Sequence, residues 1–196
     1  MRKHLAPRLG AAFEAVELCD LAATDAVSMR WRQETAEIAA ARAVELLTTG
    51  RHLLLSGDPV APAELIAAPS AARAGGVAVC LLDADPHTQT ARLTERGDDP
   101  ALLELHLGFA QWMREHADDP LPRLDVLTQD AAPDARWDRV ARLVEQDQWH
   151  VAVLDTSGQQ PVQVADAVEQ WIAAGMTEEH LVMHPTDEAH PASAAS

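Results

Sequence analysis

The sequence predicts an α/β fold, a three-layer sandwich in which helices cover a mainly parallel sheet on both faces. Two observations support this. Short, continuous apolar runs recur along the chain, as is typical of strands that are buried on both faces. Segments with apolar residues three and four positions apart, the period of a helix, separate these runs. Strands that alternate with helices indicate βαβ units with right-handed crossovers.

The strands are predicted from four apolar segments, and turn residues mark two of their ends. Gly57-Asp58-Pro59 follows the second segment, and Gly75-Gly76 precedes the third. The segments are 13–21 (FEAVELCDL), 51–56 (RHLLLS), 77–83 (VAVCLLD) and 150–155 (HVAVLD). Helical periodicity predicts helices over 26–47, 100–117 and 136–145, and a last one that begins at Pro161.

The length of 196 residues fits one domain, which we place at 1–175. From about residue 176 the sequence is small, polar and proline-containing, so 176–196 is predicted to be a flexible tail. This tail holds His180, His184 and His190, but it has no cysteines or clustered carboxylates at ligand spacing. No metal site is therefore expected there.

The chain is strongly acidic, with a net charge of −16 from 15 basic and 31 acidic residues. Without a dense basic cluster it is a poor candidate for binding nucleic acid or an anionic membrane. It has no apolar run of about 18 residues and no signal-peptide pattern, so we expect a cytoplasmic protein without a membrane span. Cys19 and Cys80 lie in apolar runs and are expected to be buried, reduced thiols.

Candidate site residues follow from the fold, because ligands of open parallel sheets bind at the carboxyl ends of the strands. An aspartate in such a place is also a common helix N-cap, and we interpret Asp83-Ala84-Asp85-Pro86 as a strand-to-helix turn. Asp20 and Asp58 are better functional candidates, since each follows an apolar run and precedes a loop of small residues. Ser56 and the segment 155–158 also end strands.

Arginines supply almost all the positive charge, since Lys3 is the only lysine. Arg92 and Arg96 are four residues apart and share one helical face, and Arg114 follows in the next segment. Guanidinium groups suit phosphate oxygens. The alternative is a solvated helix face on which these arginines pair with neighbouring carboxylates.

The order of these pieces resembles the P-loop small-molecule and nucleoside kinases, a group that includes gluconate-kinase-like and shikimate-kinase-like enzymes. The resemblance rests on Leu82-Asp83-Ala84, on Arg92-Leu93-Thr94-Glu95-Arg96, and on Val153 to Gly158 before an amphipathic helix. It spans residues 1 to about 173. It implies ATP-dependent phosphorylation of a small hydroxylated metabolite or nucleotide, with ATP and Mg²⁺ as cofactors.

The resemblance also implies a role for each candidate residue. Arg92 and Arg96 would begin a lid over the phosphates, with Arg114 beside them. Asp20 would face the phosphoryl acceptor, and Asp58 would act on the metal side or the acceptor side. The remaining positions would line the acceptor pocket (Arg30, Trp31 and Ser56) or lie beside the adenine base (Asp155, Thr156, Ser157 and Gly158).

The sequence departs from this family at the phosphate loop, because it contains no G-x-x-x-x-G-K-[ST]. Residues 1–9 read like the helix that follows such a loop, so the resemblance implies that the first strand and the loop are both missing. Either the chain is a shortened kinase, or it is a non-catalytic binding or regulatory module that has lost the loop. An unrelated α/β enzyme that uses Asp20, Asp58 and a histidine is a third reading. Unpaired strand edges would also make a homodimer a candidate.

Overall fold

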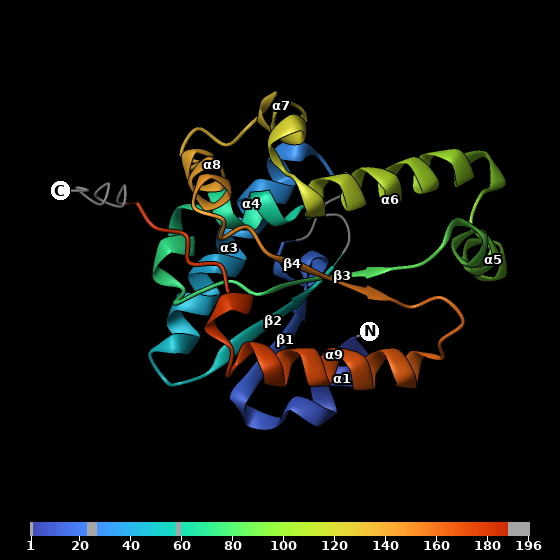
Figure 1. The fold of residues 1–196 in the computed structure, drawn as a ribbon, viewed down its shortest axis with the longest axis horizontal. Coiled ribbons are helices and arrows are strands. Elements are labelled where there is room, and N and C mark those ends of the chain that lie inside the picture. Colours follow the sequence, from blue (N-terminus) through green and yellow to red (C-terminus); the bar gives the residue numbers. More distant parts are fainter. Residues whose placement is uncertain (1, 23–26, 58–59, 188–196) are drawn as a thin grey trace.

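The computed structural model describes residues 2–22, 27–57 and 60–187, and in them helices alternate with parallel strands (Figure 1). The predicted α/β class is confirmed at this level. The strands are β1 (Phe13–Glu17), β2 (His52–Ser56), β3 (Val79–Asp83) and β4 (Val151–Asp155). The helices are α1 (Arg2–Leu9), α2 (Leu18–Leu21), α3 (Met29–Leu47), α4 (Pro62–Ala67), α5 (Pro86–Arg96), α6 (Leu103–Asp118), α7 (Leu124–Thr128), α8 (Asp138–Glu145) and α9 (Pro161–Gly175).

The strands form two separate parallel pairs. β1 pairs with β2, with Phe13 opposite His52, and β3 pairs with β4, with Val79 opposite Val151. In the part of the chain that the structure describes, β2 and β3 do not pair with each other. A cavity lined by both strands lies between the two pairs, so the described strands form two small sheets.

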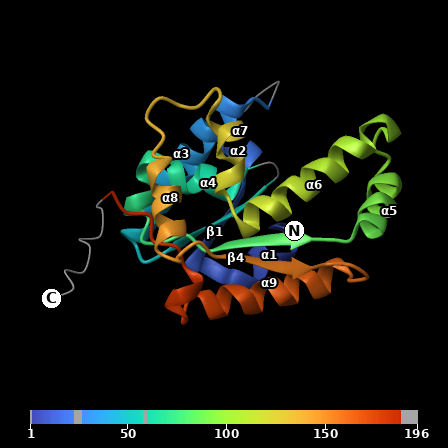
Figure 2. The ribbon, with the colours of Figure 1, turned by 45° about the horizontal axis from the view of Figure 1, so that its top comes forward.

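Helices lie on both sides of the strands (Figures 1 and 2). α1 packs against α9 and β1 on one side, and α3 packs against β2 and α4 on the other. The α5–α6 hairpin extends beyond the ends of β3 and β4, at the right of Figure 1. None of the helices described here is long and apolar enough to cross a bilayer.

The core consists mainly of two buried clusters. One joins α4, α7 and α8, and the other lies between α1 and α9. Their members are Ala61, Ala63, Ile66, Leu127, Val140, Leu143 and Met183 in the first, and Leu5, Val164, Ala165 and Val168 in the second.

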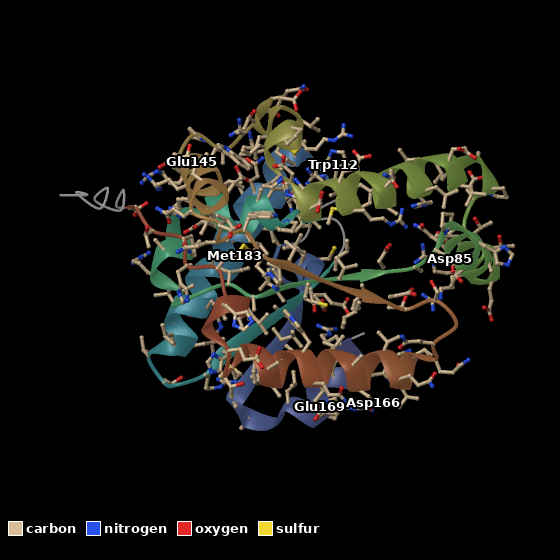
Figure 3. The ribbon with its side chains drawn as sticks, in the orientation of Figure 1. Asp85, Trp112, Glu145, Asp166, Glu169 and Met183 are labelled. Carbon is tan, nitrogen blue, oxygen red and sulfur yellow. The ribbon has the colours of Figure 1, made fainter. Side chains whose placement is uncertain are left out.

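The segment 176–187, which we expected in a flexible tail, packs against the body. Met183 is fully buried and lies near the centre of the molecule (Figure 3). Its backbone N–H donates to the Val77 carbonyl at 2.9 Å, and the Val77 N–H donates to the Met183 carbonyl at 2.8 Å. An apolar stretch, Leu181-Val182-Met183, explains this packing, since burial of such side chains offsets the cost of ordering the chain. Residues 188–196 lie outside the described ranges.

Local signals explain where the helices begin. Asp85 is the N-cap of α5: its Oδ1 accepts from the Thr88 N–H at 2.9 Å, and Pro86 occupies the first turn. The predicted strand-to-helix turn is confirmed. Ser28 caps α3 in the same way, because its Oγ accepts from the Trp31 N–H at 3.1 Å.

Replacing Ser28 with alanine is expected to lower the free energy of unfolding by about 1 kcal/mol, since one orphan N–H of α3 loses its acceptor. Urea denaturation of the purified chain measures this loss. Ser28→Asp is the matched control, because its carboxylate can accept the same hydrogen bond and should keep most of the stability. Equal losses in the two variants would contradict the capping role.

Candidate functional site

A cavity of about 830 Å³ lies between the two sheets. β2 and β3 line it, and it extends past the carboxyl ends of these strands to α5 and α6. Its size falls within the usual range for small-molecule sites, roughly 300–1,000 Å³. The cavity therefore includes the carboxyl ends of β2 and β3, which is where ligands of open parallel sheets bind.

The cavity has two chemically different parts. The part between the strands is apolar, and we call it the inner cavity; it is lined by Leu53, Leu54, Val79, Cys80 and Leu81 together with residues of α1, α3 and α9. The part beyond the strand ends is polar, and we call it the polar mouth; its members are Ser56, Asp83, Gln89, Arg92, Arg96 and Thr156.

Asp83 ends β3 and is held by an arginine from α6. Arg114 Nε lies 3.0 and 2.8 Å from the two carboxylate oxygens of Asp83, and its Nη2 donates to the Ala84 carbonyl at 2.9 Å. The Asp83 carboxylate raises the pKa of Arg114 above its ordinary value. Arg114 does not itself line the cavity. It can therefore affect a ligand by positioning Asp83 and the end of β3.

Thr156 joins the ends of β3 and β4 and also binds Arg92. Its N–H and its hydroxyl both donate to the Asp83 carbonyl at 2.7 Å. Arg92 Nη1 donates to Thr156 Oγ1 at 2.8 Å, and Nη2 donates to the Thr156 carbonyl at 2.6 Å. A guanidinium has five N–H donors, so Arg92 can hold this loop and still offer donors to an anion in the polar mouth.

The loop after β4 is shaped by its own hydrogen bonds. Ser157 Oγ accepts from the Asp85 N–H at 2.9 Å, and the Ser157 N–H donates to Asp155 Oδ1 at 2.8 Å. Hydrogen bonds from the side chain and the backbone N–H of Ser157 hold the pKa of Asp155 below its ordinary value. Gly158 has a φ of +66°, which favours glycine. Asp155, Ser157 and Gly158 do not line the cavity.

Gln89, on α5, is a member of the polar mouth that the sequence analysis missed. Its Nε2 donates to the His106 carbonyl at 3.4 Å, whereas its Oε1 is buried and has no hydrogen-bond partner among the described residues. A buried acceptor without a donor is costly, and a ligand hydroxyl or amine would satisfy it. Only its neighbours in space identify this residue, because a glutamine in a threonine-rich helix carries no signal in the sequence.

Three of the other sequence candidates, Asp20, Arg30 and Trp31, lie outside the cavity. β1 ends at Glu17, and Asp20 lies in α2, where it is paired with Arg2 and accepts from the Glu17 N–H at 3.3 Å. Arg30 pairs with Asp130 at 3.4 Å, and Trp31 lies beside it at the start of α3. The α3 residues that do line the cavity are Ala39, Ala40 and Ala43. Asp58 lies outside the described residues.

The cysteines differ from the prediction. Cys19 is exposed on α2, because the apolar run 13–21 leaves the extended conformation at Leu18. Cys80 is half-buried in β3, lines the inner cavity, and has its pKa raised to about 11 by burial. Cys80 is therefore a thiol and not a thiolate at neutral pH.

Comparison with known proteins does not add to these observations. No family model matches the sequence, and no curated protein or solved structure shows significant similarity to it. The resemblance to P-loop kinases therefore stays a prediction, and the geometry of the polar mouth carries the functional argument.

Proposed function

We propose that this chain is a phosphotransferase of the P-loop-kinase-like type that acts on a small hydroxylated metabolite or nucleotide. One observation carries the proposal: the polar mouth lies at the carboxyl ends of parallel strands and combines the cations Arg92 and Arg96 with an unpartnered acceptor, Gln89 Oε1. The helices on both sides of the strands are consistent with the three-layer sandwich of that fold.

The residues of the polar mouth suit the recognition of such a substrate. Guanidinium groups donate paired hydrogen bonds to phosphate oxygens. Arg92 and Arg96 are four residues apart on α5, and Arg96 is also paired with Asp98, to which its Nε donates at 2.7 Å. Gln89 would accept a hydrogen bond from a hydroxyl of the substrate. Phosphoryl transfer depends mostly on positioning and charge neutralisation, so these binding roles are the ones it needs from the protein.

The described residues do not by themselves fit ATP or Mg²⁺. Lys3 is the only lysine and lies within α1, and the sequence contains no G-x-x-x-x-G-K-[ST] motif. Within the described ranges, no three histidine, cysteine or carboxylate side chains gather to form a metal site. We therefore assign no residue of this chain to a reaction step that involves the nucleotide or the metal.

A second candidate function is binding without phosphoryl transfer, as a regulatory or ligand-binding module. The specific observation in its favour is that Arg92 and Arg114 already bind Thr156 and Asp83, so both cations help to hold the strand ends. A pocket organised in this way can hold a phosphorylated molecule without a phosphate loop.

Calorimetric titration separates the two candidates. Mg-ATP and a phosphorylated probe without a nucleoside, ribose 5-phosphate, are titrated in turn, and ADP release is measured over a panel of sugars and nucleosides. ATP binding with acceptor-dependent ADP release supports the phosphotransferase. Binding of ribose 5-phosphate alone, without ADP release, supports the module. If neither compound binds, both candidate functions are wrong for this chain.

Arg92→Met is expected to weaken binding of the phosphorylated probe by about 10- to 100-fold, because a charge-assisted hydrogen bond contributes roughly 1.5–3 kcal/mol. Calorimetry with ribose 5-phosphate measures the change. Arg123→Met is the matched control, since Arg123 pairs with Glu115 and does not line the cavity. If Arg92→Met binds as tightly as the unaltered chain, the polar mouth is not the phosphate site.

A further inference from the structure

The inner cavity separates two apolar strands in the middle of the fold. β2 and β3 are each five residues long, and the residues of both are only half-buried or partly exposed. Leu82, in β3, is 38% exposed, although helices lie on both sides of the strands. Apolar runs of this kind are typical of strands that are covered on all sides. One side of each strand is therefore without its usual neighbour.

The backbone of β3 shows which of its edges is already used. The Asp83 carbonyl accepts from the Thr156 N–H, which follows β4, and Val77 exchanges two hydrogen bonds with Met183. Residues two apart in a strand direct their N–H and C=O groups to the same side. Odd-numbered positions from 77 to 83 therefore face the side of β4.

The intervening residues, Ala78, Cys80 and Leu82, direct their N–H and C=O groups to the opposite side. They line the cavity together with the odd-numbered residues of β3, and the far wall of the cavity is β2. No strand in the described part of the chain pairs with that edge. It is a row of donors and acceptors on which a further parallel strand can form.

The surroundings of this edge define the strand that would fit. Leu5 and Trp171 reach the inner cavity from α1 and α9, while Ala39, Ala40 and Ala43 line it from α3. An added strand would thus be covered by apolar side chains on both faces. It would itself be apolar on both faces, with its larger side chains toward the small alanines of α3.

The start of α1 shows where such a strand would connect. Arg2 pairs with Glu17 and Asp20, at the carboxyl end of β1, so α1 begins at the carboxyl edge of the strands. α1 then leads back to Phe13, where β1 begins. A strand parallel to β2 and β3 would end at the edge where α1 begins. A short link would then complete a β–α–β unit with β1.

We propose that the inner cavity is the seat of an additional strand, parallel to β2 and β3, and that this strand is an apolar segment joined to the chain ahead of Arg2. The strand would complete one continuous parallel sheet, in which β2 and β3 both pair with it. The polar mouth would remain open at the carboxyl end. The inference does not depend on phosphoryl transfer, and its test uses no nucleotide.

The test adds such a segment to the chain and measures how well it protects the unpaired edge of β3. In a Cys19→Ser background, the chain is extended ahead of Met1 by about five alternating valines and isoleucines and a link of about five glycines and serines. The control extension has glycines and serines throughout. Both versions carry the same soluble carrier protein ahead of the extension, so that solubility does not limit the measurement. Maleimide labelling of Cys80 and hydrogen exchange of the Cys80 and Leu82 amides are then compared.

The apolar extension is expected to slow Cys80 labelling and the exchange of both amides by at least about tenfold relative to the control. Equal rates in the two versions would overturn the proposal. Equal protection by the unattached apolar peptide, at the same concentration, would overturn the assignment to a segment joined ahead of Arg2. Protection that rises with concentration of the unextended chain would instead indicate pairing between two copies and would also overturn it. Because no ligand is present, these outcomes leave the phosphotransferase to be judged by its own titration.

Discussion

Arg139→Met is expected to lower the free energy of unfolding by about 3 kcal/mol or more. The Arg139 side chain is only 1% exposed. Its guanidinium donates to the carbonyls of Ala68 at 2.6 Å, Pro69 at 3.1 Å and Ile66 at 3.4 Å. It also donates to Asp187 Oδ1 from Nη2 at 2.7 Å and from Nε at 3.0 Å. Methionine keeps the apolar stem but removes all of these hydrogen bonds, so that the Ala68 carbonyl keeps only the Ala71 N–H as a donor.

Urea denaturation at neutral pH measures this loss, and Arg30→Met is the control. Arg30 is more exposed, at 45%, and its ion pair with Asp130 lies at the surface, so its loss should cost about 1 kcal/mol or less. Arg139→Lys keeps the charge but not the planar fork, and should lie between the two. Similar losses for Arg139→Met and Arg30→Met would mean that Arg139 does not anchor the segment 176–187.

Lowering the pH from about 7 to 4 is expected to destabilise the chain through His116 by up to about 3 kcal/mol. The His116 ring is fully buried, stacks on Trp112 at 4.9 Å between ring centroids, and meets the edge of Trp149 at 5.8 Å. Trp112 lies on α6, near the body of the molecule (Figure 3). Burial lowers the pKa of His116 to about 4. Its Nε2 accepts from the Ala63 N–H at 3.4 Å, which requires the neutral ring at that nitrogen.

The sign follows from which state takes up the proton. The unfolded chain protonates a histidine near pH 6.5, whereas the folded chain resists protonation of His116 until about pH 4. The stabilisation is therefore complete above pH 6.5 and is lost as the pH falls toward 4.

Urea denaturation at several pH values, for the unaltered chain and for His116→Phe, isolates this contribution. Carboxylates titrate in both proteins, so the difference between the two curves reports His116. Below pH 6.5 the unaltered chain should steadily lose stability relative to His116→Phe. As a control, His180→Asn should leave the curve of the unaltered chain unchanged, because the His180 side chain is 72% exposed. Parallel curves for the unaltered chain and His116→Phe would show that the ring is not held neutral by the fold.

The two proposals divide the cavity between them. The additional strand would fill the inner cavity, and a substrate would occupy the polar mouth at its carboxyl end. A link from that strand to α1 would cross the carboxyl edge and bring backbone N–H groups there, which suit phosphate oxygens. Each proposal can fail without the other.

Much of the secondary structure could be read from local patterns. The apolar runs locate β2, β3 and β4 to within two residues, and helical periodicity locates α3, α6, α8 and α9 to within three. Asp85 was recognisable as part of a strand-to-helix turn, because its side chain bonds the backbone three residues away. These features depend on neighbours in the chain, so composition and spacing are enough to predict them.

The site and the pairing of the strands depend on contacts between distant segments. Arg114 meets Asp83 across 31 residues, and Arg92 meets Thr156 across 64, and neither partner is marked by spacing. Met183 is buried, and its backbone pairs with that of Val77, a residue far from it in the sequence. The gap between β2 and β3 depends on which strands pair with each other, and the pattern of residues within a strand does not record this. Local pattern sets which residues form a strand, but the packing of helices on both sides sets which strands meet, and here it leaves two apolar edges facing one cavity.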